Sequence, residues 1–459
     1  MQTIKENTII ELDITGLTHE GAGVGRYNGM AIFVTGALPG ERVQAQITEV
    51  KKQFARAKQV QVVQPSAERV EPVCPSFGHC GGCQLQHAEY KHQLELKTQL
   101  VKDSLTRIGK FTDPLVQRTL GMRNPEHYRN KVVYQVTTVA GQLKLGFFAE
   151  DSHQVVGVAQ CQLVDKELLE IADVVEGLLN KYGVTAYDWS TGQGQLRHLV
   201  LRRGQFTGEI MVIFVTGAQP FEQGVRLAKE LMNSQPAVIS VIHNVNTAGN
   251  RMIIGTDWHV LGGRMQLWER LEECTYAISP GAFFQVNSKQ AVMLYDKVYN
   301  FARLTGREIV LDLYCGVGSI GLYLARKALH VVGIEVVSEA IIDAKRNAEL
   351  NKLRNTQWMS GPVEELLPKF VNKMAAHGKR VDVIVVDPPR KGCDPQVLEV
   401  MAQAGAERIV YVSCDPATMA RDLRILVDKG YELEQVQPVD MFPGTSHVET
   451  VVLMSRKDK

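Results

Sequence analysis

Two residues near the carboxyl end of the chain have the chemistry of a nucleophile and a base. Cys414 follows the apolar run Arg408–Ser413, and Glu449 begins the last apolar run. A thiolate can add to carbon 6 of a pyrimidine, which makes carbon 5 nucleophilic, and a carboxylate can then remove the carbon-5 proton. Spacing alone leaves two alternatives open: Cys414 as a packing residue and Glu449 as a surface carboxylate.

A glycine-rich loop earlier in the chain has the features of a nucleotide-binding turn. The apolar run Ile309–Leu313 leads into the pattern Gly-x-Gly-x-x-Gly at 316–321, and a helical pattern follows from Ser319. Glycines let a backbone turn sharply from strand to helix and pass close to a ligand. The next apolar run ends at Glu335, where a carboxylate can accept hydrogen bonds from both ribose hydroxyls.

Two residues before the first glycine distinguish between possible nucleotides. Asp312 and Tyr314 place an acid and an aromatic ring at the opening of the loop. An acid there would repel a pyrophosphate, but it suits a cationic sulfonium ligand that also carries an amino group. We therefore predict a site for S-adenosylmethionine. NAD binding is the weaker alternative. A second alternative is a glycine turn that serves the fold alone and binds no ligand.

The ends of two later strands indicate the acceptor atom. The run 381–387 ends in Asp387-Pro-Pro-Arg390. Methyltransferases that act on amino groups carry an aromatic residue in the last place of a similar motif, so Arg390 argues against exocyclic nitrogen chemistry. Cytosine-5 enzymes place a Pro-Cys motif after strand four. Cys414 instead follows the fifth predicted strand, which favours carbon 5 of uracil.

A cluster of cysteines in the first quarter of the chain predicts a metal centre. Three of them lie within residues 74–83, at gaps of five and two. Thiolates this close can converge on one metal, and Cys161 is the best free candidate for a fourth ligand. Four thiolates suit tetrahedral zinc or a four-iron cluster, and His79 or His87 could replace one thiolate in a zinc site. The predicted ligands are Cys74, Cys80, Cys83 and Cys161.

Composition restricts the class of protein. The 459 residues carry Lys+Arg 51 against Asp+Glu 50, so nucleic-acid binding would depend on local basic patches. The start of the chain lacks the apolar core of a signal peptide, and no apolar run approaches membrane-spanning length. We expect a cytoplasmic protein without membrane contact, in which the eight cysteines are reduced.

The hydrophobic patterns predict a multidomain protein with three parts. Residues 1–62 read as short strands separated by glycine-rich turns, which indicates a small OB-like β-barrel. Residues 63–280 combine a helix at 89–108 with strand patterns, which indicates a central α+β domain around the cysteine cluster. Residues 281–459 alternate strands and helices, which indicates a Rossmann-like α/β domain with parallel strands and a final antiparallel pair. The strands expected there are 309–313, 330–335, a run near Trp358, 381–387, 408–413, 436–441 and 449–455, and the helices are 288–303, 319–327, 338–351, 396–404 and 418–429.

Several basic segments could contact RNA. Residues 51–58 place four cations around Phe54, and further cations lie at 128–131, at His198 and at 202–203. Such groups suit phosphate contacts, with an aromatic ring available for stacking. Solvated strand faces and hairpin tips explain the same residues without RNA.

As an ordered set, these motifs resemble the RNA uracil-5-methyltransferase family, in its 23S ribosomal RNA branch. The start of the chain, with its glycine pattern at 16–29 and Pro39-Gly-Glu, resembles the TRAM domain, a small RNA-binding barrel. The likeness extends from the first residues to the last. The matching motifs are Cys74-x5-Cys-Gly-Gly-Cys, Tyr128-Arg-Asn-Lys, Ser279-Pro-x-x-Phe-Phe-Gln-Val-Asn, Asp312-x-Tyr-Cys-Gly-Val-Gly, Asp387-Pro-Pro-Arg, Val412-Ser-Cys and His447-Val-Glu-Thr.

The resemblance implies roles for individual residues. It implies Cys414 as nucleophile and Glu449 as base of a class I methyltransferase that uses S-adenosylmethionine. It also implies a [4Fe-4S] cluster at the four cysteines, in preference to zinc. Ser319 stands where relatives often carry Thr, but the hydroxyl is kept. The implied donor contacts are Gln285, Tyr314, Glu335 and Asp387.

The resemblance also implies the partner, 23S rRNA, with the target uridine extruded from its stack. No obligate protein partner is evident. A tRNA uridine-5 methyltransferase is an alternative, but the TRAM-like module and the cysteine cluster argue against it, because the transfer-RNA branch usually lacks both. A radical S-adenosylmethionine enzyme would use a Cys-x3-Cys-x2-Cys pattern and would not need Cys414. A non-catalytic RNA-binding iron–sulfur protein would leave both Cys414 and Glu449 without a role.

Overall fold

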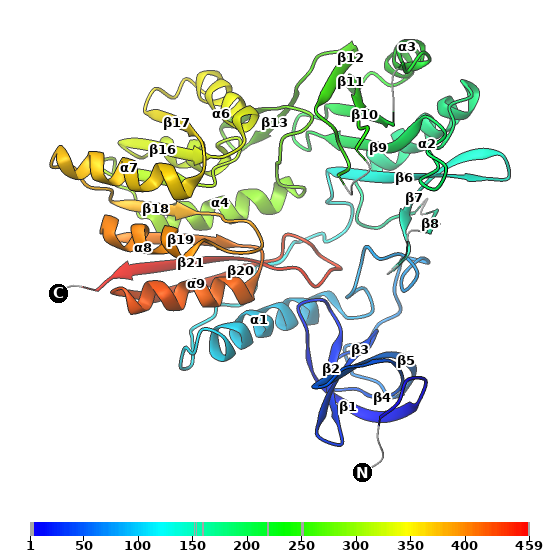
Figure 1. The fold of residues 1–459 in the computed structure, drawn as a ribbon, viewed down its shortest axis with the longest axis horizontal. Helices are drawn as coiled ribbons and strands as arrows, with labels where there is room; N and C mark the ends of the chain where they lie inside the picture. Colours follow the sequence, from blue (N-terminus) through cyan, green and yellow to red (C-terminus); the bar gives the residue numbers. More distant parts are fainter. Residues whose placement is uncertain are drawn as a thin grey trace.

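Three β-sheet modules make up the chain in the computed structural model, which describes residues 4–150, 152, 154–157, 160–217, 220–248 and 252–457 (Figure 1). A closed five-stranded barrel is followed by two seven-stranded sheets, with a small two-stranded sheet between them in sequence. Among the described residues, no helix combines the length and the apolar character that crossing a membrane requires.

The N-terminal barrel has the strand order β1-β2-β3-β5-β4 and closes on itself. Inward residues alternate with outward ones, as in β1, where Ile10, Leu12 and Ile14 are buried. The predicted short strands are confirmed; β2 lies within the glycine pattern at 16–29, where its two glycines are typical of a turn. The strands are β1 (Ile9–Leu17), β2 (Gly23–Tyr27), β3 (Met30–Thr35), β4 (Arg42–Val50) and β5 (Phe54–Gln64).

The central sheet has the order β12-β11-β10-β9-β6-β7-β8. The strand patterns predicted for the central domain are confirmed; β9 and β10, for example, pair antiparallel as a hairpin. Two helices that the sequence analysis did not predict pack on this sheet: α2 (Lys166–Lys181) and α3 (Gly224–Ser234). The strands are β6 (Lys131–Val139), β7 (Gln142–Phe148), β8 (Val155–Val156), β9 (Leu196–Arg203), β10 (Ile210–Thr216), β11 (Val238–Val245) and β12 (Asp257–Gly263), and the small sheet is β13 (Leu267–Leu271) with β14 (Cys274–Ile278).

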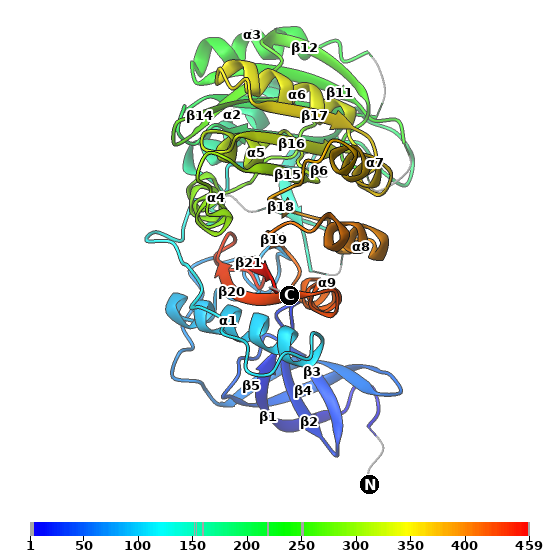
Figure 2. The same ribbon diagram turned by 90° about the vertical axis from the view of Figure 1, so that its left-hand side faces the viewer.

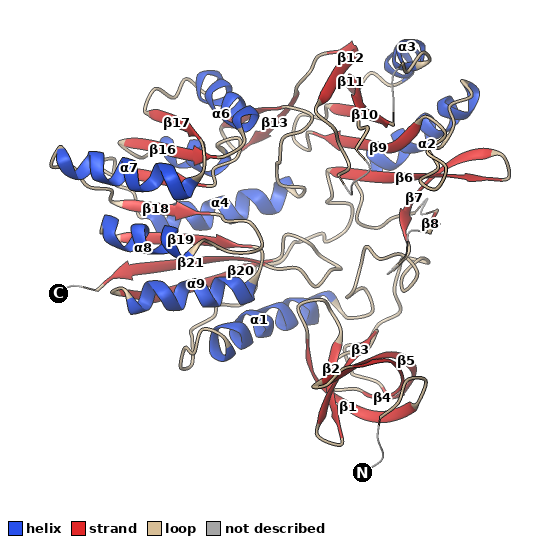
Figure 3. Ribbon diagram, in the orientation of Figure 1, coloured by secondary structure: helices blue, strands red, loops and turns tan. Residues whose placement is uncertain are grey.

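The C-terminal sheet has the order β17-β16-β15-β18-β19-β21-β20, and the predicted α/β fold is confirmed. Its first five strands pair parallel, and β21 joins β19 antiparallel. The carboxyl ends of the parallel strands therefore meet at one edge, where loops follow (Figure 3). The strands are β15 (Ile309–Leu313), β16 (His330–Glu335), β17 (Thr356–Ser360), β18 (Val383–Val386), β19 (Arg408–Ser413), β20 (Tyr431–Val439) and β21 (Glu449–Arg456).

Helices cover both faces of this sheet (Figure 2). One apolar core contains side chains of α4 (Ser288–Ala302), α5 (Ser319–Ala325) and α6 (Ser338–Leu350), and the other those of α7 (Val363–Ala376), α8 (Pro395–Ala404) and α9 (Pro416–Asp428). Asn287 is the N-cap of α4, since its side chain accepts from the backbone N–H of Gln290. The sequence analysis missed α7, which contains Pro368.

The helix α1 (Tyr90–Arg107) lies between the barrel and the central sheet in sequence, but it packs on the C-terminal domain. Its buried Val101 and Leu105 belong to the same apolar core as Leu423 of α9. It thereby brings the segment after the barrel against the domain that carries Cys414.

Candidate active site at the strand ends

The loop after β15 is a tight turn held by Glu335. The backbone N–H of Gly316 donates to Glu335 Oε2 over 3.1 Å, and that of Val337 donates to Oε1 over 2.9 Å. Gly318 has φ 78° and lies so close to Trp358 that a Cβ would come within 2.8 Å of the indole. Only glycine fits there without strain. The predicted glycine-rich turn from strand to helix is thus present, with Glu335 at its base.

Asp312 supports this loop from below. Only 1% of the residue is exposed, and its Oδ2 accepts from the backbone N–H of Gly321 over 2.8 Å. Oδ1 has no hydrogen-bond partner among the described residues. Burial, followed by the charges of Asp387 and Glu335, raises the pKa of Asp312 to about 8. Asp312 is therefore largely protonated at neutral pH in the free protein, and a cation bound nearby would favour its carboxylate form.

Asp387 and Glu449 bring two more carboxyl groups to the same edge. Asp387 follows β18, and Glu449 begins β21 with 5% of its surface exposed. Burial raises the pKa of both groups, and the charge of Asp387 raises that of Glu449 further, while Arg390 opposes this effect. Repulsion among buried carboxylates is relieved by a cation bound between them. Asp312, Glu335, Asp387 and Glu449 are called the acidic cluster below.

The sequence analysis did not single out Tyr295, which faces the acidic cluster from α4. Its hydroxyl donates to Ser319 Oγ over 3.1 Å. Burial raises its pKa, and so do the charges of Asp387, Asp312 and Glu449. A periodic apolar stripe in α4 explains the residue equally well from sequence, so only the fold shows its neighbours.

Cys414 lies beside this cluster, at the end of β19. Burial, together with the carboxylates of Glu449 and Asp387, raises the pKa of the thiol to about 12, against the opposing effect of Arg390. The thiol is partly exposed. The structure therefore brings Cys414 into the electrostatic range of Glu449 and Asp387, which come from different strands. The thiol is protonated at neutral pH in the free protein.

The two other predicted donor contacts lie on either side of the cluster. Gln285 is 7% exposed, and its carbonyl accepts from Asn130 Nδ2 over 3.2 Å, which ties it to the segment before β6. Tyr314 adopts φ 61°, and its hydroxyl donates to Glu364 over 3.4 Å. Burial raises the pKa of the Tyr314 phenol, so it stays a hydrogen-bond donor.

A buried ion pair anchors the loop that leads to Glu449. Lys97 of α1 donates to Asp440 over 2.5 Å, and both side chains are fully buried. Tyr90 also donates to Asp440, over 2.9 Å, and Lys97 donates to the carbonyl of Phe442. The sequence analysis singled out neither member of the pair, because 343 residues separate them. The pair fixes the loop 440–448 between β20 and β21.

The predicted metal ligands lie within electrostatic range of one another. Burial raises the pKa of Cys83 to about 12, and the sulfurs of Cys161, Cys80 and Cys74 raise it further, while a hydrogen bond from Gln86 opposes them. Gln86 Nε2 donates to Cys83 Sγ over 3.1 Å. Thiol sulfurs suit a metal or an iron–sulfur cluster. In the described part of the chain, however, no three His, Cys, Asp or Glu side chains are arranged to hold a metal ion.

The predicted histidine alternatives for a zinc site gain no support. His87 is 2% exposed, and neither ring nitrogen has a hydrogen-bond partner among the residues that the structure describes. Burial lowers its pKa to about 4, so the ring is neutral, and it packs against Phe77 with ring centroids 5.2 Å apart. His79 is not brought into a metal-binding group either, within the described residues.

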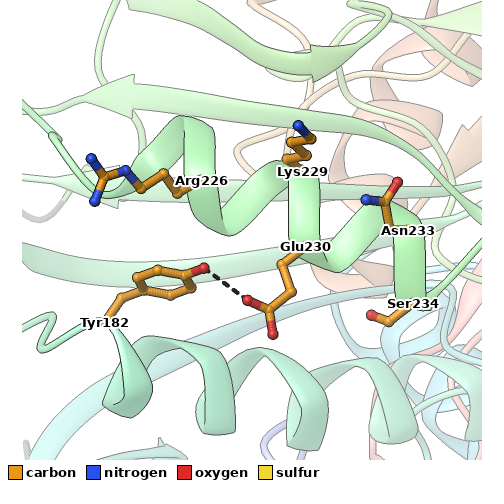
Figure 4. Close-up of a pocket in the computed structure, with 6 residues that line it drawn as sticks. All are labelled: Tyr182, Arg226, Lys229, Glu230, Asn233 and Ser234. Carbon is orange, nitrogen blue, oxygen red and sulfur yellow. Dashed lines mark hydrogen bonds between the residues drawn. The ribbon is translucent and has the colours of Figure 1, made fainter.

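Two pockets differ in their relation to these residues. An open one of about 530 Å³ lies between α2 and α3 and is lined by Tyr182, Arg226, Lys229, Glu230, Asn233 and Ser234 (Figure 4). Tyr182 donates to Glu230 across it, over 2.7 Å, and no predicted site residue lines it. A second pocket of about 290 Å³ is lined by Cys414 and Arg390. The chemistry of the strand ends is thus connected to the smaller pocket.

Comparisons with known proteins place this site in a family. The family model described as tRNA (Uracil-5-)-methyltransferase matches residues 89–457, and the TRAM domain model matches residues 5–60. The chain belongs to the RNA (uracil-5-)-methyltransferase family. Its members depend on S-adenosylmethionine, and the predicted TRAM barrel and methyltransferase domain are confirmed.

Individual relatives agree with this assignment. An uncharacterised RNA methyltransferase of Halalkalibacterium halodurans is 44% identical over 455 residues, which cover 99% of this chain and 98% of the relative. One of Oceanobacillus iheyensis is 43% identical with the same coverage. The solved tRNA (uracil-54, C5)-methyltransferase of Pyrococcus abyssi, in complex with S-adenosyl-L-homocysteine, has a TM-score of 0.77 and 29% identity. That match covers 97% of this chain and 100% of the other.

Proposed function

We propose that this methyltransferase transfers a methyl group from S-adenosylmethionine to carbon 5 of a uridine in 23S rRNA, through a covalent bond to Cys414. The observation that carries the proposal is the convergence of Cys414, Glu449 and Asp387 at one strand edge of a uracil-5-methyltransferase fold. Cys414 is the nucleophile and Glu449 the base. Among the described cysteines, Cys414 is the one that lies near Glu449, the buried acid at the start of β21.

The donor would be held by Gln285, Tyr314, Glu335 and Asp387. Tyr314 belongs to the loop after β15, and Glu335 is hydrogen-bonded to that loop. Glu335 can accept from ribose hydroxyls, and Asp387 can accept from an amino group. When bound, S-adenosylmethionine supplies an electrophilic methyl group on a cationic sulfur. The acidic cluster supports this assignment, since its mutual repulsion disfavours an anionic ligand and favours a cationic one.

The chain's own residues would act in a fixed order. The Cys414 thiol first loses its proton to solvent. The thiolate sulfur then forms a bond to carbon 6 of the extruded uracil, and the electron pair of the ring double bond moves to carbon 5 and the carbonyl oxygen. After carbon 5 is methylated, Glu449 removes its remaining hydrogen as a proton. The electron pair of that bond reforms the ring double bond, and the carbon–sulfur bond breaks to release the Cys414 thiolate.

The high pKa of Cys414 imposes a condition on this order. In the free protein the thiol is neutral, because it is buried beside carboxylates. A cation bound in the acidic cluster would lower the pKa of Cys414 and favour its thiolate. We therefore infer that the donor binds before Cys414 attacks the uracil.

We further propose that Cys74, Cys80, Cys83 and Cys161 hold a [4Fe-4S] cluster. The mutual electrostatic influence of these sulfurs and the hydrogen bond from Gln86 to Cys83 support a shared centre. Anaerobically purified protein should contain iron and acid-labile sulfide, and Cys80→Ala should lose both. Stoichiometric zinc without sulfide would replace the iron proposal with a zinc site.

A tRNA uridine is the second candidate substrate. The solved Pyrococcus abyssi enzyme favours it, since that tRNA enzyme matches 97% of this chain, including its N-terminal part. A barrel at the start of the chain therefore does not by itself distinguish the two RNA classes. The cysteine cluster is the remaining feature in favour of 23S rRNA.

One experiment separates the candidates. The protein is incubated with labelled S-adenosylmethionine and either 23S rRNA or a tRNA pool, both lacking 5-methyluridine, and the methylated nucleotide is mapped. We expect 5-methyluridine in 23S rRNA alone, and no transfer by Cys414→Ala. Methylation of tRNA alone would establish the second candidate. No transfer to either RNA by the native protein would favour a non-catalytic RNA-binding role.

A further inference from the structure

The smaller pocket beside Cys414 joins three parts of the chain. We call it the junction pocket. Residues of the barrel, of α1 and of the strand-end loops meet there, and the hydroxyl of Ser446 donates to the carbonyl of His19 over 2.7 Å, which fastens the barrel to the loop before β21. The lining residues that matter here are Leu17, His19, Arg107, Ile108, Arg390, Cys414 and His447.

The junction pocket has a cation where the acidic cluster has carboxyl groups. Arg390 is that cation, and His19 and His447 line the pocket beside it as hydrogen-bonding rings. Burial, and then nearby cations such as Arg390 and Lys97, lower the pKa of His447, so this ring is neutral at neutral pH. Its two acids are already engaged. Asp103 pairs with Arg107 over 3.1 Å, and Asp415 accepts from the first backbone N–H groups of α9.

An apolar wall faces this basic rim. Ile108, at the end of α1, is 46% exposed, and Leu17 and Leu100 lie in the same lining. An apolar surface beside cationic groups suits a nucleotide, whose base packs on the wall while its phosphate lies near the cations. At about 290 Å³ the pocket is at the small end of ligand sites, roughly 300 Å³, which fits one nucleotide better than a helix.

The pocket is not the place for the target base itself. A uracil bonded to Cys414 through carbon 6 must present the adjacent carbon 5 to Glu449. Neither Glu449 nor Asp387 lines the junction pocket, and neither does any residue of the donor loop. The target base therefore lies on the side of Cys414 that faces the acidic cluster. The RNA backbone then leads from the target nucleotide to the junction pocket.

We propose that the junction pocket holds the nucleotide next to the target uridine, with its base against Ile108 and its phosphate toward His19 and Arg390. This inference rests on the proposed function, since it needs an RNA uridine at Cys414. In this proposal the N-terminal barrel, through Leu17 and His19, helps to position the RNA next to the reacting uridine.

Photo-crosslinking tests the position of this nucleotide. Ile108 is replaced by p-benzoylphenylalanine in the full-length chain, which is irradiated with S-adenosyl-L-homocysteine and the RNA that the native protein methylates. We expect crosslinks at the immediate neighbour of the uridine that becomes 5-methyluridine. The control carries the same group at Leu329, which is 55% exposed just before β16, at the opposite edge of the sheet.

The outcomes separate the two proposals. Absence of 5-methyluridine with the native protein would contradict the proposed function. Methylation that proceeds normally, with Ile108 crosslinks at the target uridine itself, at distant nucleotides or nowhere, would overturn the junction-pocket inference alone. Crosslinks of equal yield from Leu329 at the same nucleotide would overturn it as well.

A charge substitution gives an independent measurement. Ile108→Glu places a carboxylate beside the expected phosphate and should raise KM for the RNA about tenfold, while Kd for S-adenosylmethionine stays unchanged. Leu329→Glu, the matched control, should change neither quantity. An unchanged KM in Ile108→Glu protein that binds the donor normally would contradict the proposal.

Discussion

The regions on either side of Cys414 differ in the kind of polar group they contain. The acidic cluster gathers four carboxyl groups from the ends of β15, β16, β18 and the start of β21, whereas the junction pocket gathers His19, Arg390 and His447 from the barrel and two loops. Each region disfavours its own ionised groups and favours a ligand of opposite charge. The comparison indicates how one strand edge can bind a cationic donor in one region and an anionic RNA in the other.

The two regions also differ in how they are built. The acidic cluster comes from strands of one sheet, in which β16, β15 and β18 are neighbours and β21 lies beyond β19. The junction pocket needs the barrel and α1 to be fixed against that domain. The Lys97–Asp440 pair and the Ser446–His19 hydrogen bond fix them. The geometry of the junction pocket therefore depends more than that of the acidic cluster on residues distant from Cys414.

Removing the nucleophile should have the largest effect. Cys414→Ala should lower kcat by about 10⁴-fold or more, since no neighbouring group can replace a covalent nucleophile. Adduct formation with RNA that carries 5-fluorouridine should vanish on denaturing gels. Binding of the donor, measured by calorimetry, should persist, because the acidic cluster is intact.

Removing the base should have a smaller and different effect. Glu449→Gln should lower turnover by about 10³-fold while the adduct with unmodified RNA accumulates, since attack by Cys414 no longer leads to loss of the carbon-5 proton. Glu432→Gln, at an exposed position of β20, is the control and should leave turnover unchanged. Loss of turnover without accumulation of the adduct would assign Glu449 another role.

Breaking the buried ion pair tests the anchoring of the basic side. Lys97→Met leaves Asp440 without its cation and should lower the free energy of unfolding by about 3 kcal/mol, as measured by urea denaturation. The double variant Lys97→Met/Asp440→Leu should recover part of this loss. Equal losses in both proteins would show that Asp440 does not depend on the charge of Lys97.

The smallest effect concerns pH. Because the pKa of Cys414 is raised to about 12, its alkylation by iodoacetamide should increase about tenfold per pH unit from pH 7 to 9, without a plateau. S-adenosylmethionine should accelerate alkylation about tenfold relative to S-adenosylhomocysteine, since only the former carries a cationic sulfur. Mass spectrometry of the Cys414 peptide measures both rates. Equal rates with the two ligands would contradict the electrostatic coupling between the donor site and Cys414.

Local pattern was sufficient for the parallel strands and for several helices of the C-terminal domain. The runs ending at Leu313 and Ser413 match β15 and β19, because apolar residues buried on both faces leave an uninterrupted signal. Helix α7 was missed because Pro368 interrupts its pattern, although the fold tolerates it. The apolar residues of α2 recur at helical spacing, with Leu168, Ile171 and Val175 buried, although the sequence prediction did not include this helix.

By itself, the sequence determined the glycine turn, the parallel strands of the C-terminal domain and the residues able to act as nucleophile and base. These depend on backbone freedom, periodicity and side-chain chemistry, which short segments carry. Only the tertiary structure decided that Tyr295 faces the acids, that Lys97 reaches Asp440 across 343 residues, and that His19 meets the loop before Glu449. Charge and burial at a site depend on which distant segments pack together, and no local spacing records that.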